Sequence, residues 1–247
     1  MLWPPPSSAQ ALGSHRREEP RRAHLGLSSV EIRRLPSVNE SVTNWLADRS
    51  VAVHHLRVRS PMSPIQIPLS RPRVDSLLEP YRDVIGRDFP GYRNHVYRTV
   101  TYAMHFLGQN PGYEPLVETA FVYHDLGLWT DRALAYLEPS EQIALRDNER
   151  HGWGLDPEAL WGAIHWHHKI FRYRGNHQEV IEACRKADWI DASQGWIRKG
   201  MSRAAIAQVE ATFPNLGFHR SLLRLAKDYG GSTLVGCWRV VRGIVKW

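Results

Sequence analysis

The residues of this chain best suited to chemistry are histidines and aspartates on expected apolar helix faces. His124 and Asp125 stand side by side in FVYHDLGLWTD, residues 121–131. Positions 0, 3, 4, 7, 8 and 11 of a helix share one face, and counting from Val117 places this pair on an apolar face. Two buried ionisable groups are costly unless something pairs with them. The pair therefore needs a partner.

The same pattern recurs in two later segments, where an expected helix again carries two titratable side chains near one end of its apolar face. The three pairs are His124 and Asp125, His167 and His168, and Asp188 and Asp191. Neutral imidazoles and carboxylates can satisfy one another by coordinating a divalent cation. We therefore expect the three helices to converge on a metal site. Each side chain taken alone could instead be an ordinary core residue with internal hydrogen bonds.

A set of motifs in a fixed order adds a seventh residue. RNHVYR contains His95, YHDLG contains the doublet and KADWIDAS contains Asp188. His95 lies off the best apolar stripe of its own segment, so periodicity supports it only weakly. With these motifs in this order, residues 75–195 resemble the HD superfamily of metal-dependent phosphohydrolases.

The resemblance implies a helical bundle that binds a divalent ion (Mn, Fe, Mg, Co, Ni or Zn). The ligands that it implies are His95, His124, Asp125 and Asp188. Some members bind a second ion through histidines that lie between the doublet and the last aspartate. His167 and His168 would then hold this ion, and Asp125 would bridge the two. The Gly-Tyr-Pro motif of members that cleave cyclic dinucleotides is absent, so we do not predict that activity.

We expect water activation and phosphate binding around the metal. A cation would lower the pKa of a bound water from about 15.7 to ~7–9 and polarise a phosphoryl oxygen. The predicted function is hydrolysis of a phosphoester of a small metabolite or nucleotide. The expected catalytic residues are Asp125, Asp191 and Lys186, and the expected phosphate-binding residues are Arg93, Arg98 and Lys169. Each cation could instead be a solvated surface charge, and Asp191 could instead orient a metal ligand.

Three other functions fit the same residues. Some HD-like proteins use two irons to activate dioxygen, and His167 and His168 keep this alternative open; two irons per chain and oxygen-dependent turnover would distinguish it. A small-molecule lyase or hydratase is also compatible with the motifs. A non-catalytic binding module would retain ligand binding without turnover.

Composition sets limits on the class of protein. The chain has 247 residues, a net charge of +7, and two cysteines without a CxxC pattern. This argues against a disulfide scaffold or a thiolate zinc site and favours a reducing, cytoplasmic location.

No apolar run is long enough to span a membrane. Residues 1–75 hold 11 Lys and Arg against 6 Asp and Glu, so the remainder is near neutral and no nucleic-acid partner is indicated. The oligomeric state stays open.

Local signals divide the chain into two parts. Residues 1–61 combine prolines with clustered arginines and lack periodicity, so we expect an irregular extension, or a non-native segment if Met62 is the biological start. Residues 62–247 are expected to form an all-α domain. The expected helices are 94–107, 115–128, 140–150, 157–171, 176–192, 202–212, 219–229 and 233–246.

Overall fold

The computed structural model of the chain describes residues 64–245. All described residues belong to one compact unit. Within them the regular structure is helical and contains no strand, which confirms the all-α class. The expected irregular extension, residues 1–61, lies outside the described residues.

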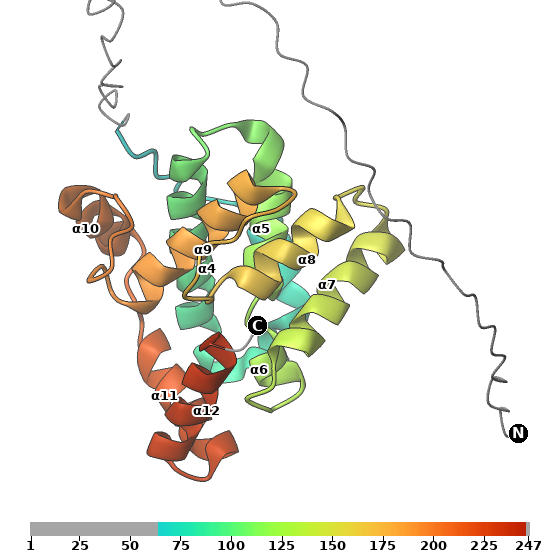
Figure 1. Ribbon diagram of the computed structural model, residues 1–247, viewed down its shortest axis with the longest axis vertical. Helices are drawn as coiled ribbons and strands as arrows, with labels where there is room; N and C mark the ends of the chain where they lie inside the picture. The colour runs from blue at the N-terminus through green and yellow to red at the C-terminus, as the bar shows by residue number, and fades with distance from the viewer. Residues whose placement is uncertain (1–63, 246–247) are drawn as a thin grey trace, which may run out of the picture. The chain divides into compact units, whose positions relative to one another are not determined.

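The helices of the described unit follow one another with short connections (Figure 1). The longer helices are α4 (Phe89–Phe106), α5 (Glu114–Tyr123), α7 (Leu137–His151), α8 (Pro157–Trp166), α9 (Gln178–Ala192), α10 (Arg203–Thr212), α11 (Phe218–Gly230) and α12 (Thr233–Val245). The shorter ones are α2 (Pro72–Leu78), α3 (Arg82–Ile85), α6 (Gly127–Thr130) and the 3₁₀ turns η1 (Glu79–Tyr81), η2 (Gly86–Asp88) and η3 (Pro111–Tyr113). Among the described residues, no helix combines the length and the apolar character needed to cross a membrane.

Helix α4 lies at the centre of the bundle. It packs along α9 and α5, while α8 packs against α5, α7 and α9 (Figure 1). Helices α11 and α12 pair with each other, and α11 also contacts α4. At this crossing the backbones are close, since a Cβ atom on Gly91 would lie 3.3 Å from Phe218. The core is therefore built mainly by α4, α5, α8 and α9, with α11 and α12 added at one end.

Two helices end earlier than their apolar periodicity predicts, and both ends lie at histidine motifs. The helix expected over 115–128 ends at Tyr123, and the one expected over 157–171 ends at Trp166. The first is followed by a turn before the short helix α6. The expected positions of these two helix ends were therefore wrong.

The residue that follows each of these helices is a histidine whose side chain hydrogen-bonds to a carbonyl in the last turn of the helix. The Nδ1–H group of His124 donates to the carbonyl of Phe121 (2.7 Å), and that of His167 donates to the carbonyl of Ile164 (2.5 Å). Carbonyls in the last turn of a helix lack partners within the helix. A side chain that bonds to such a carbonyl takes the place of the backbone N–H that would continue the helix. The capped ends turn the following residues toward the interior.

Candidate metal centre

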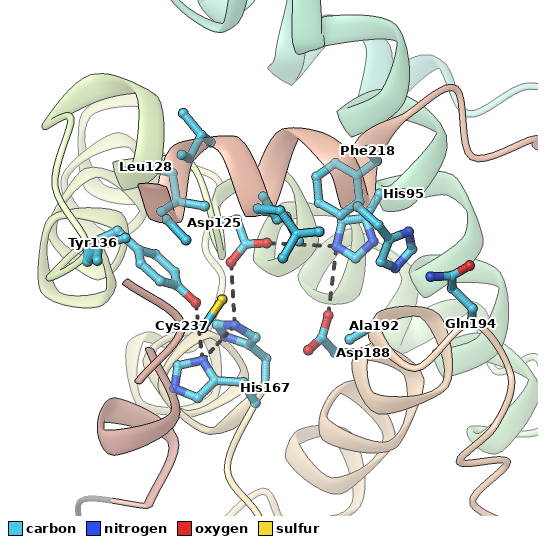
Figure 2. Close-up of a pocket in the computed structure, with 17 residues that line it drawn as sticks. His95, Asp125, Leu128, Tyr136, His167, Asp188, Ala192, Gln194, Phe218 and Cys237 are labelled. Atoms are coloured by element: carbon cyan, nitrogen blue, oxygen red, sulfur yellow. Dashed lines mark hydrogen bonds and ion pairs between the residues drawn. The ribbon is translucent and has the colours of Figure 1, made fainter. Parts of the chain in front are cut away.

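The ends of α5 and α8 meet the middle of α4 and the last turns of α9 at one place in the interior (Figure 2). The buried side chains gathered there are His95 of α4, His124 and Asp125 after α5, His167 after α8, and Asp188 of α9. The segments that carry them are distant in sequence. The structure thus brings together all four ligands that the resemblance implies, together with His167.

The candidate ligand atoms of four residues lie within 4 Å of the Nε2 atoms of His95 and His124. Nε2 of His95 lies 3.0 Å from Nε2 of His124. Oδ2 of Asp125 lies 3.3 Å from the His124 nitrogen and 3.9 Å from the His95 nitrogen. Oδ1 of Asp188 lies 3.7 Å from each of them. Ligand atoms about 2.1 Å from a cation and about 90–109° apart lie about 3.0–3.4 Å from one another. The two shortest distances fall in this range, and the 3.7 and 3.9 Å distances are longer.

The protons on the two imidazoles explain why a cation fits there. Nδ1 of His124 donates to the carbonyl of Phe121, which can only accept. Nδ1 of His95 lies 2.6 Å from Oδ2 of Asp191, and burial lowers the pKa of His95 to about 4. With Nδ1 of each ring directed to an acceptor, the two Nε2 atoms, 3.0 Å apart, are the ring atoms left to bind a cation.

The carboxylates of Asp125 and Asp188 lie beside these rings. Burial acts to raise the pKa of Asp125, but His124 and His167 hold it well below its ordinary value. Burial raises the pKa of Asp188 to about 7, with Asp125 and Asp191 adding to the shift and His167 opposing it. Among the described residues, His95, His124 and Asp125 form a buried group that could hold a metal ion.

A second set of polar atoms lies on the other side of Asp125. Its Oδ1 is 3.5 Å from Nε2 of His167, and that nitrogen is 2.9 Å from Nδ1 of His168. The hydroxyl of Tyr136 is 3.4 Å from the same His168 atom. Figure 2 shows Tyr136 and His167 on the side of Asp125 that faces away from His95. Asp125 therefore presents one oxygen to each group.

Asp191 hydrogen-bonds to His95 from behind the candidate metal site. Its two oxygens accept from the guanidinium of Arg98 at 2.5 and 2.8 Å, and Oδ2 also accepts from His95. Burial acts to raise the pKa of Asp191, but Arg98 and His95 hold it well below its ordinary value. Of the two roles expected for Asp191, the geometry matches the orientation of a ligand. Arg98, expected to bind phosphate, is instead buried against Asp191.

The other expected cations are Arg93, Lys186 and Lys169. Arg93 is paired with Asp75 at 2.6 Å. Lys186 lies 5.2 Å from the ring centre of Phe106, and Lys169 is buried. None of the three lines the cavity over the metal ligands. Arg93 and Lys186 lie on α4 and α9, where neighbours in sequence point to different sides of the helix.

A cavity of about 430 Å³ opens over the metal ligands. His95, Asp125, His167, His168 and Asp188 all line it. Its other walls come largely from α11, including Phe218, whose ring stacks on His95 with centroids 4.3 Å apart. The sequence reasoning missed Tyr136 and Phe218. Phe218 gives no signal in sequence that separates it from a core aromatic, and neither residue belongs to a motif.

Comparisons with family models, with curated protein sequences and with solved structures find no match to this chain. Its function is therefore argued from the geometry of its own residues.

Proposed function

We propose that this protein is a metal-dependent hydrolase. The single observation that carries the proposal is the 3.0 Å separation of the Nε2 atoms of His95 and His124, beside two carboxylates. The proposed ligands of the first ion are His95, His124, Asp125 and Asp188. Those of a second ion are His167 and His168, with Asp125 shared.

A divalent cation in such a site supplies a water of lowered pKa and polarises the electrophilic group of the substrate. The residues of the chain prepare the site for it. Phe121, Ile164 and Asp191 fix the Nδ1 protons of the three rings, so their Nε2 atoms stay available as ligands. Asp125 directs one oxygen toward each group. The ligands are therefore held in place before an ion binds, which favours tight binding.

Hydrolysis of a small phosphoester is the first reaction to test, as two adjacent ions can bind phosphoryl oxygens directly. Among the described residues, no lysine or arginine lines the cavity. Recognition of the phosphoryl group would then depend on the ions and on the hydroxyl of Tyr136, which lies at the cavity.

Hydration of a neutral small molecule is the second candidate, and the same lack of a cation in the described lining favours it. A neutral substrate needs no positive counter-charge from the walls. A phosphoester substrate would release phosphate, while a hydratase would add water without a leaving group. Product analysis separates the two.

The test is metal content followed by turnover. Protein purified without chelators is analysed for bound metals and then assayed on phosphoester and neutral electrophile panels with Mn²⁺, Co²⁺, Ni²⁺, Mg²⁺, Zn²⁺ and Fe²⁺. We expect one or two ions per chain in the wild type and loss of metal and turnover in Asp125→Ala. Asp131→Ala is the matched control, because Asp131 is exposed, accepts a hydrogen bond from Thr130 and does not line the cavity.

Three outcomes would count against hydrolysis. Unchanged metal content in Asp125→Ala would refute the site. Two irons with oxygen-dependent turnover would favour an oxygenase. Ligand binding without turnover under any metal would favour a binding module.

A further inference from the structure

The walls of the cavity differ sharply in chemistry from its floor. The floor consists of the metal ligands, whereas the walls are built mainly from leucine, phenylalanine and alanine side chains. The apolar wall residues used in this argument are Leu128, Leu134, Phe218, Leu222, Leu223 and Cys237. We call this set the apolar wall. Tyr136, Gln194 and His219 are the polar residues that line the cavity outside the floor.

The polar groups of these walls are uncharged or already engaged. Nε2 of His219 donates to the backbone carbonyl of Asp191 at 3.0 Å, and its Nδ1 bonds to the Asn215 amide. The Tyr136 hydroxyl is directed toward His168. Among the described residues, no arginine, lysine or glutamate lines the cavity. A charged group placed against the apolar wall would therefore lose water without gaining a counter-ion.

The physical consequence is selectivity for the body of the substrate. An ion moved from water to an apolar surface without a partner is strongly disfavoured, while each methylene buried there is favoured. A volume of about 430 Å³ falls in the range of about 300–1,000 Å³ typical of small-molecule sites. Binding of a charged nucleoside di- or triphosphate against these walls is therefore unfavourable, and binding of a small hydrocarbon body is favourable.

We propose that the substrate has a polar head that meets the metal ligands and an uncharged, apolar body that packs against the apolar wall. This inference rests on the proposed function for the head and on the cavity alone for the body. It applies to a phosphomonoester and to a neutral electrophile alike, since both can carry such a body. It excludes substrates that carry a second charged group where the body would lie.

The experiment uses probes with one head and varied tails. Straight-chain hydroxamic acids from two to ten carbons have a metal-binding head, and primary amides of the same lengths lack one. Hydroxamates that end in a carboxylate supply charged tails. Binding is measured by calorimetry on Zn²⁺-loaded and metal-free protein. We expect affinity to rise about fourfold per methylene until the cavity is full, and a carboxylate end to weaken binding at least about tenfold.

A substitution in the wall tests the location. Leu223 lines the cavity yet is 53% exposed, so Leu223→Arg adds a cation without burying it in the core. We expect about tenfold weaker binding of long alkyl tails and tighter binding of carboxylate-ended tails. Leu234→Arg is the control, because Leu234 is 85% exposed and does not line the cavity. Circular dichroism checks that both variants are folded.

The outcomes separate this inference from the proposed function. Affinity that is independent of tail length, or higher for charged tails, overturns the inference even if the hydroxamate head binds only to metal-loaded protein. A gain with tail length in both amides and hydroxamates, with no effect of Zn²⁺, supports the inference while refuting the metal centre. Equal effects of Leu223→Arg and Leu234→Arg would also overturn it.

Discussion

Asp191 accepts a 2.6 Å hydrogen bond from Nδ1 of His95 while its two oxygens are held by the guanidinium of Arg98. All three side chains are buried. The contact fixes the proton of His95 on Nδ1 and directs Nε2 toward His124. The ion pair of Asp191 and Arg98 thus orients His95, a candidate metal ligand.

Removal of this carboxylate should affect both metal binding and stability. We expect Asp191→Asn to weaken metal affinity about 10–100-fold, as loss of a group that orients a ligand does. It should also lower the free energy of unfolding by about 3 kcal/mol, because the charge of Arg98 stays buried without a counter-ion. Chelator competition and urea unfolding measure the two effects. Unchanged metal affinity would show that Asp191 does not orient His95.

The matched control is Asp75→Asn. Asp75 also pairs with an arginine, Arg93, at 2.6 Å, but both side chains are a third or more exposed. Exposed pairs contribute about 0–1 kcal/mol, and neither residue lines the cavity. Metal affinity should not change, and stability should change by less than about 1 kcal/mol.

Apolar periodicity predicted which residues of α5, α8 and α9 face inward, but it could not predict where two of these helices end. The stripe that contains His124 continues through Leu128 in sequence. The helix nevertheless ends at Tyr123 because the His124 side chain bonds to the Phe121 carbonyl. A side-chain cap of this kind depends on the rotamer and on the neighbouring helices, and these are not visible in a one-dimensional pattern.

Proximity in sequence was a poor guide to the rest of the site. Arg98 and Lys186 are close in sequence to His95 and Asp188, yet neither lines the cavity. Four of the six residues of the apolar wall, Phe218, Leu222, Leu223 and Cys237, lie instead beyond the last motif, and these leucines resemble those of any core helix. Asp191 was found because it shares a helical face with Asp188.

The two groups of ligands should be separable by mutation. His167→Ala combined with His168→Ala should remove one ion per chain and keep the other, whereas His124→Ala should remove the ion shared by His95 and Asp188. The reason is that Asp125 presents different oxygens to the two groups. Metal content per chain at saturation measures this.

His165→Ala is the control for this pair of experiments, since His165 bonds to Glu141 and does not line the cavity. It should keep the wild-type metal content. A double His167 and His168 variant that binds as many ions as the wild type would contradict the second site.

Metal binding should weaken as the pH falls below about 7. Burial raises the pKa of Asp188 to about 7 in the metal-free protein, so below this pH an ion must displace a proton to bind. We expect affinity to fall up to about tenfold per pH unit below 7. Asp188→Asn should bind metal more weakly and lose this part of the pH dependence. A flat affinity between pH 5 and 7 would contradict Asp188 as a ligand.

The same group gives a prediction for the metal-free protein. A carboxyl whose folded pKa exceeds its unfolded value keeps its proton longer in the folded state. Its contribution to stability is therefore complete below the unfolded pKa of about 4 and is lost as the pH rises to about 7. We expect the metal-free wild type to lose stability across this window relative to Asp188→Asn, and metal to restore it near pH 7. Denaturant unfolding at each pH measures the difference.

The hydroxyl of Tyr136 should matter for turnover more than for metal content. It lines the cavity and lies 3.4 Å from Nδ1 of His168, where it can donate a hydrogen bond to a substrate head group. Tyr136→Phe keeps the ring that packs beside the histidines and removes only the donor. Loss of one such donor costs about 100-fold or more in kcat in well-studied cases, so we expect a loss of at least about tenfold in kcat with unchanged metal content.

The control is Tyr113→Phe, which removes a hydroxyl that bonds to Glu179 away from the cavity and should leave kcat unchanged. Equal kcat values for the two variants would place the Tyr136 hydroxyl outside the reaction.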